Sequence, residues 1–288
     1  MDISKQKIQA RRSFIFTPGL KPDMFQKALD CGTDIVCVEL EDGIAPKDKL
    51  LARKNAIELF KKDKNQNGVE RILRINCIRE KFGIEDVKAI LDVERPPPAI
   101  MMPKVTSPDE VTLLDKLLTE RQHSCRLHII IETNQGLELA NQIAVCSPRI
   151  DALFFGGVDM AAELRCENSW DSLLYARSRV VHAASTAGID VIDVPFLDLE
   201  NPEGMRQEAI RVKKLGFTGK GSVHPKQIPI LNEVFTPSKQ SIEKAKRIIK
   251  TFQEANTGLV VVDGKLIEKP VLREMHRIVS IADKISHR

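Results

Sequence analysis

Residues 34–46, DIVCVELEDGIAP, join a buried strand to a cluster of carboxylates. The first half is rich in β-branched residues, which is typical of a strand buried on both faces. Glu39, Glu41 and Asp42 follow at once, so that three acids occupy four positions. Carboxylates this close repel one another unless a cation, a basic side chain or water offsets them. The stretch therefore indicates either a solvated loop edge or a site that holds positive charge.

Seven other segments share this apolar, β-rich pattern, and stretches with helical spacing separate them. The seven are residues 13–18, 71–76, 99–104, 127–132, 152–157, 190–196 and 219–224. Strands that are apolar on both faces and alternate with helices indicate a parallel sheet covered on both sides. Because eight strands fall within about 230 residues, we predict an α/β fold of the closed (β/α)8 barrel type. A doubly wound open sheet is the alternative, and the lack of a Gly-rich phosphate fingerprint after the first strand disfavours it.

The predicted barrel occupies residues 11–236, and residues 237–288 form an extension outside its repeating unit. The extension is expected to contain an amphipathic helix over 237–255, a hairpin with its turn at 263–264, and a final helix over 271–285. It is interpreted as a clasp that closes the barrel bottom, as a lid, or as an oligomer arm.

The composition excludes several classes of protein. A net charge of +4, with one Trp and one Tyr, argues against nucleic-acid binding because base-stacking side chains are scarce. No apolar run approaches the ~18 residues of a membrane span. The opening residues lack a secretory apolar region, and six cysteines without a CxxC pair suit a reducing compartment. We therefore expect a cytoplasmic protein.

Polar residues gather where the predicted strands end. In a barrel of this type the chemistry lies at the carboxyl ends of the strands, because the loops converge there. A single acid at such a place is more often a helix cap or a solvated residue, yet six strand ends here carry polar groups. Charge confined to one rim indicates an active site. The residues concerned include Glu39, Glu41, Asp42, Arg74, Asn76, Lys104, Glu132, Asp159 and His224.

Glu132 and Asp159 are the candidate metal ligands. They follow adjacent predicted strands, so their carboxylates can face one volume. Two oxygen ligands with the remaining coordination open suit Mg²⁺, which keeps waters and takes oxygens from substrate. No His or Cys lies at ligand spacing beside them, which disfavours Zn²⁺. Arg74 should face the same volume and grip a substrate carboxylate with its guanidinium fork.

Lys49 and Arg53 are candidates for binding an anionic ligand. They lie four residues apart after the acidic cluster, on one face of the helix expected there. The alternative is a solvated helix face without a ligand.

Seven blocks of the sequence resemble successive blocks of the citrate lyase β-subunit and malyl-CoA lyase superfamily. In order they are RRSFIFTPG, VELEDGIAPKDKLLAR, LRIN, MMPKV, IIIETNQGLELANQIA, LFFGGVDMAAEL and GKGSVHPKQI. They cover nearly the whole chain. The tail VDGKLIEKPVLREMHRI resembles the C-terminal lid of the free-standing CoA-dependent members, the malyl-CoA and citramalyl-CoA lyases.

The resemblance implies a Mg²⁺-dependent carbon–carbon lyase on a TIM barrel. It assigns metal binding to Glu132 and Asp159 and binding of the substrate carboxylate to Arg74. Glu41 and Asp42 match the family's acidic pair, which would order metal-bound water and nearby basic groups. It also implies a homo-oligomer, a trimer or hexamer, in which the tail reaches a neighbour.

Two residues depart from the family pattern. Glu39 stands where the family usually has Asp. Glu268 matches the catalytic Asp of the lid, with a side chain about one methylene longer. Glu268 would act as the acid or base at the enolate carbon.

The reaction expected is cleavage of a 3-hydroxyacyl-CoA thioester to acetyl-CoA and a 2-oxo acid such as pyruvate or glyoxylate, or the reverse condensation. Mg²⁺ would act as Lewis acid and template. Arg12 and rim amides are candidates for stabilising the enolate. For a CoA thioester substrate, the basic face formed by Lys49 and Arg53 is the candidate for binding coenzyme A. Three alternatives stay open: a citrate lyase β-subunit acting on an acyl-carrier protein, a hydroxyacyl-CoA thioesterase, and a non-catalytic protein that binds acyl-CoA or metal.

Overall fold

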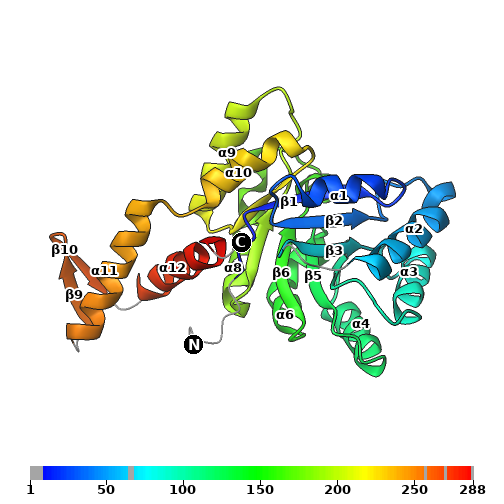
Figure 1. Cartoon of the computed structure of the whole chain (residues 1–288), viewed down its shortest axis with the longest axis horizontal. Helices are drawn as coiled ribbons and strands as arrows, with labels where there is room; N and C mark the ends of the chain where they lie inside the picture. Colours follow the sequence, from blue (N-terminus) through cyan, green and yellow to red (C-terminus); the bar gives the residue numbers. More distant parts are fainter. Residues whose placement is uncertain (1–8, 64–67, 256–257, 269–270, 287–288) are drawn as a thin grey trace.

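Eight parallel strands form a closed barrel in the order of the chain (Figure 1). The structure is a computed structural model, and it describes residues 9–63, 68–255, 258–268 and 271–286. The strands are β1 (Ser13–Pro18), β2 (Ile35–Glu39), β3 (Glu70–Arg74), β4 (Ala99–Met102), β5 (Arg126–Ile131), β6 (Ile150–Phe155), β7 (Asp190–Asp193) and β8 (Gly219–Ser222). Strand β8 pairs with β1 and closes the sheet. The predicted barrel is confirmed, and the open-sheet alternative is wrong.

Helices follow the strands and cover the outside of the barrel (Figure 1). They are α1 (Asp23–Leu29), α2 (Lys49–Lys62), α3 (Lys81–Leu91), α4 (Pro108–Glu120), α5 (Asn134–Glu138), α6 (Ala140–Val145), α7 (Gly157–Leu164), α8 (Trp170–Ala187), α9 (Pro202–Leu215) and α10 (Ile228–Phe235), with short 3₁₀ turns η2 (Pro46–Asp48) and η3 (Pro225–Gln227). Local capping explains several helix ends. Asn201 Oδ1 accepts the N–H of Gly204 at 2.8 Å before α9, which ends at Gly216 with φ 113°.

Side chains alternate between two cores because successive strand residues point to opposite faces. One core fills the barrel interior and the other lies between the sheet and the helices. The interior core consists of Phe14, Ile35, Cys37, Ile72, Ala99, Met101, Ile130, Ala152, Phe154 and Ile192. Gly219 and Gly221 are required on β8, since a Cβ there would lie 1.8 Å from the Arg11 carbonyl oxygen or 2.8 Å from the Pro195 ring. The interior is therefore a packed core that leaves room only at its end.

The extension has a small core of its own. It contains α11 (Lys239–Ala255), the antiparallel strands β9 (Leu259–Val262) and β10 (Lys265–Glu268), and α12 (Leu272–Ser286). The hairpin turn has φ 49° at Asp263 and φ 72° at Gly264, as a type I′ turn requires. The extension projects to one side with the hairpin at its outer end, and α12 runs back to the barrel (Figure 1). The predicted helix, hairpin and helix are thus present in that order.

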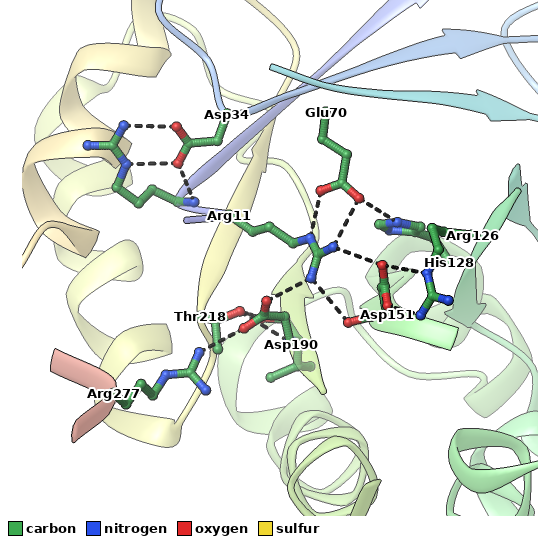
Figure 2. A network of polar contacts seen from close by, with 11 residues as sticks. Arg11, Asp34, Glu70, Arg126, His128, Asp151, Asp190, Thr218 and Arg277 are labelled. Carbon is green, nitrogen blue, oxygen red and sulfur yellow. Dashed lines mark hydrogen bonds and ion pairs between the residues drawn. The ribbon is translucent and has the colours of Figure 1, made fainter. Parts of the chain in front are cut away.

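A network of ion pairs occupies the amino-terminal end of the barrel, with Arg11 at its centre (Figure 2). Arg11 Nε lies 2.6 Å from Glu70 Oε2, and Arg11 Nη1 lies 2.8 Å from Asp190 Oδ2. Burial acts to raise the pKa of Glu70, but His128 and Arg11 hold this pKa well below its usual range. Arg277 of α12 contacts the other oxygen of Asp190 at 2.8 Å. The extension is therefore docked at the end opposite the carboxyl ends of the strands.

Within the described part of the chain, no helix has both the length and the apolar character needed to cross a membrane. The start of the chain, on which the expectation about a secretory leader depends, lies partly outside the described residues.

Candidate active site

Glu132 and Asp159 line one cavity of about 240 Å³ at the carboxyl ends of the strands, here called the rim cavity. Glu132 directly follows β5, is buried, and accepts the N–H of Lys104 through Oε1 at 2.8 Å. Asp159 lies in the first turn of α7, after β6. A Cβ at Gly156 would lie 2.2 Å from Glu132 Oε2, so a glycine there gives this carboxylate its space. The expected convergence of the two carboxylates on one volume agrees with this geometry.

The two carboxylates stand in surroundings that suit a cation. Burial, together with the charge of Asp159, raises the pKa of Glu132 to about 8. Burial and the charge of Asp42 raise the pKa of Asp159. A divalent cation would offset both effects, because an opposite charge favours the ionised forms.

No group of three or more His, Cys, Asp or Glu side chains is arranged for metal binding among the described residues. A metal at Glu132 and Asp159 would therefore have two protein carboxylates and would take its other oxygens from water and substrate. That donor set is the one Mg²⁺ accepts. The residues present fit the predicted ion.

Arg74 ends β3 and lines the same cavity. Its Nε lies 2.5 Å from Glu39 Oε2, and its Nη1 lies 3.2 Å from Glu41 Oε2. The guanidinium carbon stands 4.7 Å from the centre of the Phe16 ring. Nη2 has no partner among the described residues, so the fork retains a donor for an anionic ligand. The carboxylate of Glu39, the residue that departs from the family pattern, is thus an ion-pair partner of Arg74.

The acidic pair after β2 is held by two lysines. Lys104 Nζ lies 2.6 Å from Glu41 Oε1 and 3.0 Å from Asp42 Oδ1. Lys49 Nζ donates to the Glu41 carbonyl oxygen at 2.6 Å and to Asn76 Oδ1 at 2.6 Å. Burial raises the pKa of Glu41. Burial also acts to raise the pKa of Asp42, but the hydrogen bond from Lys104 helps to lower that pKa below its ordinary value. The cluster is thus a neutralised part of the rim, rather than a solvated loop edge.

Lys104 is a site residue that the sequence reasoning did not assign. Lys104 lies at the end of the fourth predicted strand, where solvent exposure alone could explain a lysine. The signal that could have found it is its position in the MMPKV block, opposite the acids that follow the second strand.

Three predicted substrate contacts are corrected by the structure. Arg12 precedes β1, and its Nε lies 2.8 Å from Asp34 Oδ2 at the amino-terminal end of the barrel. Its Nη1 donates to Thr236 Oγ1 at 2.9 Å. Because the carboxyl ends lie at the other end of the barrel, the prediction that Arg12 stabilises an enolate there is wrong.

The expected basic face for coenzyme A is also wrong, because Lys49 and Arg53 are both buried. Arg53 Nε donates to Asp86 Oδ1 at 2.5 Å, and Asp86 Oδ2 in turn accepts the N–H of Asn76 at 2.8 Å. Both basic residues therefore fix the loops after β2 and β3 and do not present charge to solvent.

Glu268 lies exposed at the end of β10, in the hairpin at the outer end of the extension (Figure 1). Since α12 contacts the amino-terminal end of the barrel, the extension does not cover the rim cavity of its own chain. This placement favours the oligomer arm over a lid acting within one chain.

The family model described as HpcH/HpaI aldolase/citrate lyase matches residues 12–225. The chain belongs to this family. The resemblance found in the sequence is confirmed, and with it the assignment to a family of carbon–carbon lyases.

Named relatives fall into two groups. The citrate lyase subunit beta of Haemophilus influenzae is 32% identical over 92% of this chain and 94% of its own. The L-malyl-CoA/beta-methylmalyl-CoA lyase of Rhodobacter capsulatus is also 32% identical, over 94% of each chain. A structure of the citrate lyase beta subunit from Mycobacterium tuberculosis, complexed with oxaloacetate and magnesium, is 25% identical with a TM-score of 0.68. The match covers 82% of this chain and 100% of that one.

Proposed function

We propose that this protein is a Mg²⁺-dependent lyase that cleaves a 3-hydroxyacyl-CoA thioester, of the malyl-CoA or citramalyl-CoA type, to acetyl-CoA and a 2-oxo acid, or catalyses the reverse condensation. The observation that carries the proposal is the shared cavity of Glu132, Asp159 and Arg74. The family supports it, and so does the relative that binds magnesium together with oxaloacetate, a 2-oxo acid.

Each part of the cavity has a task in this reaction. Glu132 and Asp159 would hold Mg²⁺, which when bound supplies a Lewis acid for the 2-oxo acid oxygens. Arg74 would bind the carboxylate of the substrate through its remaining donor. The apolar wall, which includes Phe16 and Phe154, excludes water from the reacting carbon atoms.

Cleavage begins at the substrate hydroxyl. A base takes the proton of the substrate hydroxyl, and the carbon that bore the hydroxyl becomes the carbonyl carbon of the 2-oxo acid. The bond between C2 and C3 of the acyl chain breaks, and its electron pair passes to C2, the carbon next to the thioester carbonyl, as an enolate. An acid then protonates that carbon. We assign the acid to Glu268, supplied by the extension of a neighbouring chain.

The proposal of a homo-oligomer, a trimer or hexamer, depends on the outer face of the hairpin. Its side chains Leu259, Val261 and Leu266 are exposed and apolar. Exposed apolar residues also stand at the rim, namely Val158 and Leu197. A second copy of the chain would pair these two surfaces and bring Glu268 to the rim cavity.

A cytoplasmic location is proposed as well. The six cysteines are free, and thiols stay reduced in that compartment.

The test is an assay of purified protein with Mg²⁺ and a panel of malyl-CoA, citramalyl-CoA and citryl thioesters. Equal amounts of acetyl-CoA and 2-oxo acid are expected. Release of free CoA with an intact hydroxy acid would establish a thioesterase instead. Activity only on a thioester of acyl-carrier protein would favour the citrate lyase β-subunit, a candidate that the 32% identical relative supports. No reaction with any member would contradict an enzyme of this class.

A further inference from the structure

Lys104 has a backbone conformation that non-glycine residues rarely adopt. Its φ is 54°, in the left-handed region. Such a conformation persists only where surrounding contacts hold it, and it is concentrated at functional sites. Both main-chain groups of Lys104 are held here: its N–H donates to Glu132 Oε1 at 2.8 Å, and its carbonyl oxygen accepts from Arg79 Nη2 at 3.0 Å.

The loop around Lys104 is packed tightly against the next loop. The carbonyl oxygen of Val105 accepts from Thr133 Oγ1 at 3.0 Å. A Cβ at Gly136 would lie 2.3 Å from that same oxygen. The turn at Lys104 is therefore fixed relative to Glu132, and its amide is aimed at one oxygen of the metal carboxylate.

The side chain of Lys104 reaches in another direction. Its ammonium lies between Glu41 and Asp42, at 2.6 Å and 3.0 Å, and is partly exposed. Glu41 is shared, because its Oε1 contacts Lys104 while its Oε2 lies 3.2 Å from Arg74 Nη1. Lys104 thus connects the loop after β4, in which it lies, with the loops after β2 and β5.

We propose that Lys104 is a positioning residue that couples the metal carboxylate Glu132 to the acidic pair and keeps Arg74 available for the carboxylate of the 2-oxo acid. The inference deepens the proposed function and depends on it. Without the ammonium, Glu41 and Asp42 would hold Arg74 more strongly and would repel an anionic ligand. The same excess of negative charge would attract Mg²⁺. Loss of the Lys104 ammonium is therefore expected to weaken binding of the 2-oxo acid without weakening binding of Mg²⁺.

The experiment measures Mg²⁺ affinity by calorimetry, and then the affinity for pyruvate or glyoxylate at saturating Mg²⁺. Lys104→Met should weaken the 2-oxo acid about tenfold, since a compensating charge is lost, and should leave Mg²⁺ binding unchanged or tighter. Lys104→Arg should keep most of the 2-oxo acid affinity. Lys104→Gly should behave as Lys104→Met does, and should fold at least as well because glycine adopts a positive φ freely.

A double variant and a surface control complete the test. Adding Glu41→Gln to Lys104→Met should restore part of the 2-oxo acid affinity, since the uncompensated acid is then absent. Lys81→Met, at a solvent-exposed lysine of α3, should alter neither affinity. Unchanged 2-oxo acid binding in Lys104→Met, or parallel weakening of both ligands with a lower melting temperature, would overturn the inference. If the unmodified protein binds neither ligand, the proposed function fails, and the inference fails with it.

Discussion

At the scale of a single residue, burial sets the charge state of Glu132, one of the two proposed metal ligands. With its pKa raised to about 8, Glu132 is mostly protonated at neutral pH in the metal-free protein. Mg²⁺ binding must then release that proton, so affinity should rise about tenfold per pH unit well below pH 8 and level off above it. Calorimetry between pH 6.5 and 8.5, in buffers of different ionisation enthalpy, measures both the affinity and the proton release. A pH-independent affinity would contradict this description of Glu132.

Asp159 is expected to be needed for metal binding and dispensable for folding. Asp159 is half-buried in the first turn of α7, and Asp159→Asn removes one of the two carboxylates proposed to bind the metal. Mg²⁺ affinity should fall by at least about 100-fold, because the described residues place no third carboxylate in a metal-binding group with these two. The melting temperature of the metal-free variant should change little, and should rise if anything, since a repulsion with Asp42 is relieved. Unchanged Mg²⁺ binding would remove Asp159 from the site.

Binding of a 2-oxo acid should depend on the planar shape of the Arg74 guanidinium as well as on its positive charge. Arg74→Lys keeps the cation but loses the fork that contacts Glu39 and Glu41 together. Binding of a 2-oxo acid should weaken by about 1–3 kcal/mol, the value of a hydrogen bond to a charged group. Mg²⁺ affinity, measured on the same samples, should remain the same. Equal 2-oxo acid affinity in both proteins would mean that the guanidinium does not bind the substrate.

At the scale of elements, the helix α2 holds the acidic loop through Lys49. Its ammonium donates to the carbonyl oxygens of Leu40 and Glu41 and to Asn76. Lys49→Met should lower the free energy of unfolding by about 1–3 kcal/mol, since buried acceptors are left without a donor. Urea denaturation measures this. The exposed neighbour Lys47 provides a control, because Lys47→Met should cost almost nothing.

The elements also show what the sequence could and could not predict. Strands such as β2, β4 and β5 were predictable because a strand buried on both faces is a local run of apolar residues, whereas β8, with the sequence GKGS, contains no such run. Glu132, a proposed metal ligand, was predictable because it directly follows such a run, and Asp159 because it lies in the first turn of the helix after the next such run. Arg53 was not, since the partner that buries it, Asp86, lies 33 residues away on another helix. The position of Arg12 was not predictable either, because Asp34, the partner that fixes it at the amino-terminal end, lies 22 residues away.

For the whole molecule, the position of the extension decides whether the site is complete in one chain. Arg277 of α12 contacts Asp190 at the amino-terminal end of the barrel (Figure 2). Glu268 lies in the hairpin, at the outer end of the extension. A mechanism that needs Glu268 therefore requires a second copy of the chain. Glu268→Gln should abolish turnover without changing Mg²⁺ affinity, and Glu268→Asp should retain measurable activity because the carboxylate is kept.

Two inactive variants, mixed, test this arrangement directly. Chains with Glu268→Gln keep an intact rim cavity, and chains with Asp159→Asn keep an intact extension. If each cavity receives the hairpin of a neighbour, an equal mixture, unfolded and refolded together, should recover roughly a quarter of the normal activity, because random assembly brings an intact cavity and an intact hairpin together at that frequency. Each variant refolded alone should stay inactive. A mixture as inactive as its components, despite mixed oligomers being demonstrated by mass spectrometry, would show that Glu268 does not act on a neighbouring chain. The acid that protonates the enolate would then have to come from the rim itself, where Glu41 and Asp42 are the carboxylates beside Lys104.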